Sequence, residues 1–66
     1  MCVANAYFIK DGNPELIMEN VEIIQGSETN VWHLTDLFGH QKQITARLQS
    51  LHLLENRFFF EALRAE

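Results

Sequence analysis

The middle of the chain contains its most informative run of residues, Val31-Trp32-His33-Leu34-Thr35-Asp36-Leu37-Phe38-Gly39. The first four residues of this run are rich in β-branched and aromatic side chains, which favour a strand. Asp36 and Gly39 are residue types common in turns, and they flank two apolar residues. We expect a strand over residues 31–34 and then a tight connection, with Leu37 and Phe38 filling a core or an interface and so anchoring the fold.

The residues before this run form patterns typical of strands. Residues 2–10 alternate between two mainly apolar sets, which predicts a strand with both faces partly covered. One set is Ala4, Ala6 and Phe8, and the other is Val3, Tyr7 and Ile9. The turn-forming run Asp11-Gly12-Asn13-Pro14 then predicts a hairpin. We expect its return strand over residues 15–18, a third strand over 21–24, and a loop over 25–30.

The last third of the chain fits two kinds of structure. Residues 44–66 contain neither Gly nor Pro, and apolar residues recur at the helical spacings of three and four, which suits a helix over residues 44–64. The same region also alternates as strands do, with a change of phase that a β-bulge near Gln49-Ser50 explains. Glu55-Asn56 would then form a turn, and residues 57–61 would form a strand covered on both faces. Periodicity leaves both structures open.

Length and composition limit the core and predict association. With 66 residues the chain is one domain, and a domain of this size buries only about 60% of the surface that its unfolded chain exposes. A single cysteine cannot form an intrachain disulfide. Hydrophobic residues make up 47% of the chain, which is more apolar surface than so small a core readily hides. We therefore expect a homodimer.

The charge distribution argues against two classes of partner. The formal net charge is −4, and the five Lys and Arg residues are scattered singly, so we expect no binding to nucleic acid. The N-terminus has no basic opening, and its apolar run is interrupted at Asn5 and Lys10, so we expect neither a secretory signal nor a membrane span. We expect a cytoplasmic protein, in which the reducing compartment keeps Cys2 as a free thiol.

The N-terminus carries the only cysteine, Cys2, one residue from the amine of Met1. A metal held by the Cys2 thiolate, the Cys2 backbone nitrogen and the Met1 amine would close two five-membered chelate rings, which suits a square-planar ion. Planar nitrogen and sulfur donors favour Ni(II) or Cu(II), whereas structural zinc prefers four separate side chains. The alternative is that Cys2 is a small buried hydrophobic residue without metal chemistry, as most free cysteines are.

The three histidines differ as candidate ligands. His33 and His52 lie within strand patterns rich in apolar residues, where we expect them to face solvent or a rim. His40 lies in a loop and is a further candidate nickel ligand, since imidazole commonly binds this metal. No Asn, Asp or oxyanion element can be assigned to a catalytic Cys–His pair, and a chain this short has little room for a substrate cleft. We expect a binding protein rather than an enzyme.

The chain resembles the CooT family of small nickel-binding proteins in three segments, which are Met1-Cys2, Leu16-Ile17-Met18-Glu19-Asn20-Val21 and Leu34-Thr35-Asp36-Leu37-Phe38-Gly39. The resemblance implies an all-β, mainly antiparallel fold: one nickel-binding SH3-like β-barrel domain over residues 1–66, which forms a cytoplasmic homodimer. It also implies Ni(II) binding through Cys2 and delivery of nickel, as a metallochaperone, to maturing carbon monoxide dehydrogenase. His40 departs from the family pattern, in which an acidic residue is expected after the Leu-Phe-Gly element.

The stoichiometry and the function each have an alternative. If two chains meet near their N-termini, two Cys2 thiolates and two backbone nitrogens complete one planar site per dimer; otherwise each chain binds its own ion, with water or another residue as the fourth ligand. The thiolate and the amide nitrogen must lose protons to bind, so affinity is expected to fall with pH. The alternative function is a metal-free SH3-like module with a groove for protein partners, lined by Trp32, Tyr7 and the phenylalanines.

Overall fold

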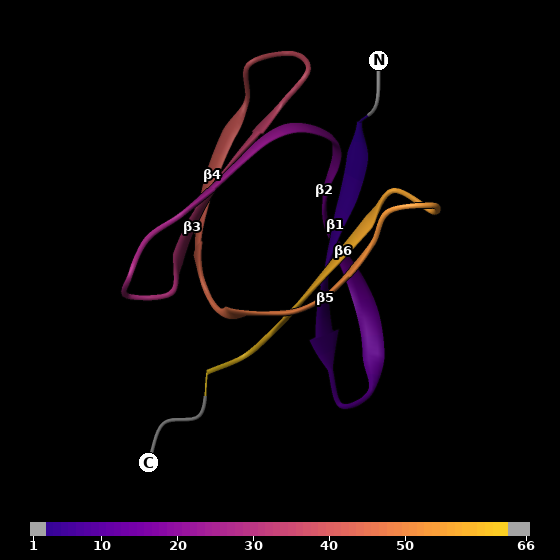
Figure 1. Ribbon diagram of the computed structural model, residues 1–66, viewed down its shortest axis with the longest axis vertical. Coiled ribbons are helices and arrows are strands. Elements are labelled where there is room, and N and C mark those ends of the chain that lie inside the picture. The colour runs from indigo at the N-terminus through magenta and orange to yellow at the C-terminus, as the bar shows by residue number, and fades with distance from the viewer. Residues whose placement is uncertain (1–2, 64–66) are drawn as a thin grey trace.

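A computed structural model describes residues 3–63 of the chain, which form strands and connecting turns (Figure 1). The strands are β1 (Ala4–Lys10), β2 (Asn13–Gly26), β3 (Val31–Asp36), β4 (Gln41–Thr45), β5 (Arg47–His52) and β6 (Arg57–Glu61). They form one six-stranded sheet in the order β4-β3-β2-β1-β6-β5. Neighbouring strands are antiparallel except β1 and β6, which run parallel. The expected all-β, mainly antiparallel class is confirmed.

The sheet curls without closing into a barrel. The edge strands β4 and β5 do not pair with each other in the described part of the chain, although a single residue, Ala46, connects them. Because so short a connection joins opposite edges, the sheet bends until these edges meet at Ala46, whose exposed fraction is 0%. The Ala46 carbonyl accepts a hydrogen bond from Trp32 Nε1 at 3.0 Å. The sheet is therefore curled but open, where the resemblance implies an SH3-like β-barrel.

The last third of the chain is extended rather than helical. Residues 3–63 contain no helix, so the alternative of a helix over residues 44–64 is wrong for the part that the structure describes. The predicted bulge is confirmed, because Leu48 pairs with Phe60 and Ser50 with Phe59, which leaves Gln49 as the extra residue. Pairing of β6 with β1 and β5 supplies the backbone hydrogen bonds that a helix would have made locally.

β2 is longer than the sequence predicts. The strands expected over residues 15–18 and 21–24 are one strand of 14 residues, which pairs first with β1 and then with β3. Between these two ladders Glu19 and Asn20 face a single residue of β1, Asn5, and this is a β-bulge. The backbone of Asn20 has a φ of 54°, which asparagine tolerates better than most residues. The bulge bends β2 so that one strand serves both neighbours.

The core is small and lies on the inner face of the curl. Its buried hydrophobic residues are Ala6, Val21, Leu34, Ala46 and Phe60. Trp32 packs edge-on against Phe60 with ring centroids 5.4 Å apart, and it is partly buried against this core. Phe59 points to the opposite face and stacks on Tyr7 at 5.4 Å. Both faces of β6 are therefore covered, as the phenylalanine run predicts.

Leu37 and Phe38 do not fill the core. Phe38 is 75% exposed and Leu37 is 42% exposed, because the turn after β3 directs both side chains away from the sheet. Leu34, three residues before Leu37 in the chain, is the buried residue instead. The expectation of a core role for Leu37 and Phe38 is wrong, and their role in an interface stays a prediction.

Candidate metal centre

The predicted ligands Met1 and Cys2 lie outside the described residues, but the point from which they extend is well defined. Val3 precedes β1, whose first residue, Ala4, pairs with Val21 of β2. Val21 in turn pairs with Asp36 at the end of β3. Ala4 and Asp36 are thus two strand spacings apart, or about 10 Å. Figure 1 shows the start of β1 and the β3–β4 turn at the same end of the molecule.

Asn5 ties the start of β1 to two other segments. Its backbone N–H donates to the carbonyl of Asn56 at 2.9 Å, and its side-chain Oδ1 accepts a hydrogen bond from the backbone N–H of Asn20 at 3.1 Å. The carbonyl of Asn20 accepts the N–H of Leu37 at 3.0 Å. One chain of hydrogen bonds therefore joins the β5–β6 turn, β1, β2 and the β3–β4 turn at this end of the sheet.

Asp36 organises the β3–β4 turn. Its Oδ1 accepts the backbone N–H groups of Phe38 and His40, each at 2.9 Å, and its carbonyl accepts the N–H of Gly39 at 3.1 Å. Its own N–H donates to the carbonyl of His40 at 3.0 Å. Gly39 has a φ of 89°, a conformation that a side chain would strain. With the bond from Leu37 to Asn20, every backbone N–H of residues 36–40 has a partner, which makes the turn rigid.

The Asp36 carboxyl is electrostatically stabilised in its charged form. Burial by itself raises the pKa of Asp36, but the hydrogen bonds from the His40 side chain and from the backbone N–H groups of His40 and Phe38 outweigh it. The pKa of Asp36 is therefore lower than usual. Asp36 is an anion over the ordinary pH range and acts as the acceptor around which the turn folds.

The side chain of His40 is held by this carboxylate. Its Nδ1 lies 3.0 Å from Asp36 Oδ2, and the side chain is 76% exposed. With Nδ1 engaged, Nε2 is the ring nitrogen left for a ligand, and a carboxylate on the other nitrogen is the arrangement typical of metal-binding histidines. His33 is exposed on β3, and His52 Nε2 lies 3.1 Å from Ser50 Oγ. Of the three histidines, His40 has the geometry best suited to binding a metal.

Residues 3–63 do not contain a complete metal site of their own. No three His, Cys, Asp or Glu side chains in the described part of the chain are close enough together to hold an ion. A site that includes His40 would need further donors from residues 1–2 or from another chain. The chemistry of the predicted donor set, a thiolate with backbone nitrogens, fits this requirement because it needs few side chains.

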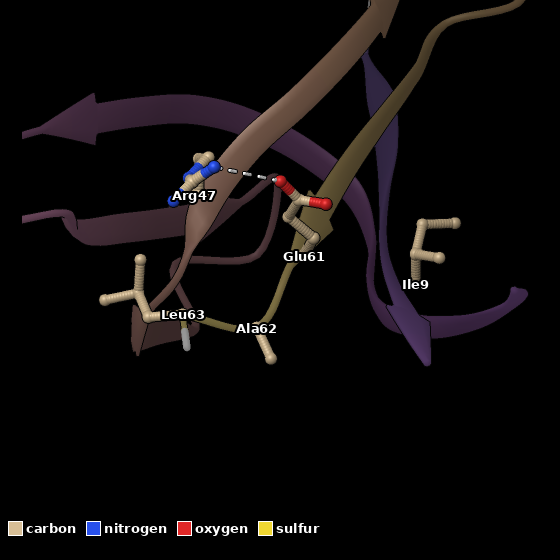
Figure 2. Close-up of a pocket in the computed structure, with 5 residues that line it drawn as sticks. All are labelled: Ile9, Arg47, Glu61, Ala62 and Leu63. Carbon is tan, nitrogen blue, oxygen red and sulfur yellow. Dashed lines mark ion pairs between the residues drawn. The ribbon is translucent and has the colours of Figure 1, made fainter. Parts of the chain in front are cut away.

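Two hollows lie at opposite ends of the sheet. One, of about 330 Å³, is beside the start of β1 and is mainly apolar; its lining includes Val3, Val21, Leu53 and Phe58. The other, of about 430 Å³, is at the far end of β1 beside Ile9 (Figure 2). It contains the ion pair between Arg47 and Glu61, 3.6 Å apart. The first hollow includes Val3, the residue that follows the predicted ligands in the chain, and the second lies at the other end of β1.

Sequence reasoning missed the roles of Asn5, Asn20 and Asp36 in this network. A signal for two of them was present, because asparagine is depleted in strands and both asparagines interrupt strand patterns. Asp36 was assigned only to a turn. Its own hydrogen-bond partners, Phe38, Gly39 and His40, are close in the chain. The link from Leu37 to Asn20 and Asn5 could not be identified, because these residues lie far from the turn in the chain.

These features define a class of small all-β protein, built on one curled sheet with the start of β1, a rigid turn and a polar network at the same end. Residues 1–61 match the family model described as CO dehydrogenase accessory protein CooT. The chain belongs to the CooT family of CO dehydrogenase accessory proteins, which confirms the resemblance seen in its motifs. No helix in residues 3–63 is long and apolar enough to cross a membrane.

Two known proteins are similar over nearly the whole chain. An uncharacterised protein of Methanocaldococcus jannaschii is 38% identical over 61 residues, which cover 92% of this chain and 98% of that protein. A crystal structure from Carboxydothermus hydrogenoformans that carries the name CooT superposes with a TM-score of 0.85 at 28% identity. The superposition covers 96% of this chain and 100% of the other.

Proposed function

We propose that this protein is a carrier of Ni(II), rather than an enzyme, and delivers the ion during maturation of a nickel enzyme such as carbon monoxide dehydrogenase. The observation that carries the proposal is the family match over residues 1–61, which includes Cys2 and relates the chain to CO dehydrogenase. The Cys2 thiolate, the Cys2 backbone nitrogen and the Met1 amine are the proposed donors. In the cytoplasm, where we place the protein, the thiol would stay reduced.

We propose His40 as a further donor to the same ion. Its support is the exposed ring, with Nδ1 held 3.0 Å from the Asp36 carboxylate and Nε2 free to bind. The β3–β4 turn lies at the same end of the sheet as the start of β1. If each chain binds its own ion, the imidazole would be the fourth donor of a planar set of nitrogen and sulfur ligands. In a site shared by two Cys2 thiolates, it would lie outside the planar set.

We propose that the carrier is a homodimer with nickel between two Cys2 residues. The proposal is supported by large hydrophobic side chains that are exposed near the N-terminal end of the sheet, which are Leu37, Phe38, Leu53 and Leu54. A second copy covering these side chains would remove apolar surface from water. It would also bring a second thiolate to the site.

The test is a nickel titration of the untagged full-length protein. Binding is measured by calorimetry and by the absorbance of the thiolate-to-nickel charge-transfer bands. We expect tight binding in the wild type and a loss of about 100-fold or more in Cys2→Ser, because the only thiolate is removed. His40→Ala should weaken binding less and shift the spectrum. His33→Ala is the matched control, since His33 is also exposed but lies within β3. Equal affinity in wild type and Cys2→Ser would overturn the proposal.

The rival function is a metal-free module that binds a protein partner. The observation that favours it is the rigid display of Leu37 and Phe38 on a turn whose backbone N–H groups are all paired. Rigid presentation of apolar side chains lowers the entropy cost of binding a partner. A wild type that takes up no nickel would favour this function.

A further inference from the structure

Asn5 occupies an irregular point of the sheet. In β2, Glu19 and Asn20 together face this one residue of β1, so the ladder between the two strands is interrupted there. A backbone N–H at a bulge loses its regular partner and must find another. The N–H of Asn20 finds the side-chain Oδ1 of Asn5 at 3.1 Å, in a partly buried position. The Asn5 side chain thus replaces a missing bond of the sheet.

The same residue is held from its other side. Its backbone N–H donates to the carbonyl of Asn56 in the turn that precedes β6, at 2.9 Å. Asn20, which Asn5 holds, accepts the N–H of Leu37 from the β3–β4 turn at 3.0 Å. Both asparagine backbones next to Asn5 are in the left-handed region, with φ of 54° at Asn20 and 56° at Asn56. The start of β1 is therefore hydrogen-bonded directly to the β5–β6 turn and is linked through Asn20 to the β3–β4 turn.

We propose that Asn5 is the positioning residue of the N-terminal nickel-binding segment, an inference that rests on the proposed function. Only Val3 and Ala4 separate Asn5 from Cys2, a path of at most about 11 Å. Fixing Asn5 limits the volume that the Cys2 thiolate and the Met1 amine can explore. It also fixes the start of β1 at the end of the sheet that carries the β3–β4 turn and His40. Ordering these donors before the ion arrives lowers the entropy cost of chelation.

Three variants of the full-length, untagged protein separate positioning from general stability. Asn5→Ala removes the acceptor for the Asn20 N–H, whereas Asn5→Asp puts a carboxylate oxygen, also an acceptor, in place of the amide oxygen. Ser27→Ala is the matched control, because Ser27 Oγ also accepts backbone N–H groups, those of Thr29 and Val31. These groups lie in the β2–β3 turn and at the first residue of β3, and they have no hydrogen bond to the Asn5 network.

The measurements are Ni(II) affinity by competition titration, the charge-transfer spectrum of the nickel-loaded protein, and amide hydrogen exchange of the metal-free protein. We expect Asn5→Ala to bind Ni(II) about three- to tenfold more weakly, the range that the loss of one hydrogen bond allows. Its spectrum should change, and the Asn20 and Leu37 amides should exchange faster. Asn5→Asp should bind at least as tightly as the wild type, and Ser27→Ala should leave affinity and spectrum unchanged.

The outcomes distinguish failure of this assignment from failure of the proposed function. If the wild type binds Ni(II) through Cys2 and Asn5→Ala matches it in affinity and spectrum, the positioning role is overturned, even if the Asn20 amide exchanges faster. An equal loss in Ser27→Ala would also overturn it, because general stability would then explain the effect. If the wild type and Cys2→Ser bind Ni(II) equally, the proposed function fails and the assignment fails with it.

Discussion

At the scale of single residues, Asp36 shows how one carboxylate builds a turn. It accepts two backbone N–H groups through Oδ1 and faces His40 Nδ1 through Oδ2. Its side chain is 11% exposed, while that of His40 is 76% exposed. The carboxylate therefore lies inside the turn and presents the imidazole on the surface. A neutral residue of the same shape would accept fewer of these bonds.

Asp36 should make folding stability depend on acidity. Its pKa is lower in the folded protein than in the unfolded chain, so its contribution is present above the ordinary aspartate pKa and is lost as the pH falls through the folded value. We expect the melting temperature to fall as the pH is lowered below the ordinary aspartate range. Asp36→Asn should lose part of this dependence, which thermal unfolding from pH 7 to pH 3 would measure. Identical pH profiles for the two proteins would contradict the assignment.

At the scale of elements, the end of β2 and the start of β3 are matched in shape. Gly26, the last residue of β2, pairs with Trp32 of β3, and a Cβ on Gly26 would lie 2.7 Å from the Trp32 ring. The Trp32 ring is held in place, because it packs on Phe60 and its Nε1 donates a hydrogen bond to the Ala46 carbonyl. Glycine is required here for close approach, not for an unusual backbone angle.

Gly26→Ala should therefore destabilise the protein by overpacking. We expect a loss of about 1–3 kcal/mol in the free energy of unfolding, the usual cost of forcing an extra methyl group into a packed site. Urea unfolding followed by the fluorescence of Trp32, the only tryptophan, would measure it. Ser27→Ala, which alters the adjacent turn without adding atoms, is the control. A Gly26→Ala variant as stable as the wild type would show that the ring moves aside.

At the scale of the whole molecule, the described residues bury few large side chains. Phe60 and Leu34 are the largest that are completely buried within residues 3–63. Several large hydrophobic residues are exposed instead, with Leu54 at 102% and Phe38 at 75%. A small core with this much exposed apolar surface is typical of a chain that associates. This imbalance supports the proposed homodimer.

Phe38→Ser should weaken the proposed dimer by about tenfold or more, because a buried aromatic anchor commonly contributes about 2 kcal/mol to an interface. Sedimentation equilibrium at several concentrations would measure the association. Leu16→Ser is the matched control, since Leu16 is 50% exposed but pairs with Tyr7, away from the β3–β4 turn. A wild type that is monomeric at all concentrations, or a Phe38→Ser variant that associates as the wild type does, would contradict the prediction.

The sequence by itself determined much of the local structure and the family. Turn residues and alternation predicted the first hairpin, because it depends on neighbours in the chain. They gave the strand over residues 57–61 and the bulge at Gln49 only as one of two alternatives, and the structure has both. The motifs identified the CooT family, and residues 1–61 match it. They also predicted Cys2 and Met1 as ligands, and this stays a prediction because both lie outside the described residues.

Only the tertiary structure decided the rest. The spacing of apolar residues could not distinguish a helix from strands in the last third of the chain. The outcome depends on whether β1 lies beside β6 and pairs with it. Spacing could not show that one strand, β2, bends to pair with two neighbours, or that Leu37 and Phe38 point outward. The link from Asn5 through Asn20 to Leu37 joins residues far apart in the chain. Such contacts arise from the curl of the sheet, which no local pattern specifies.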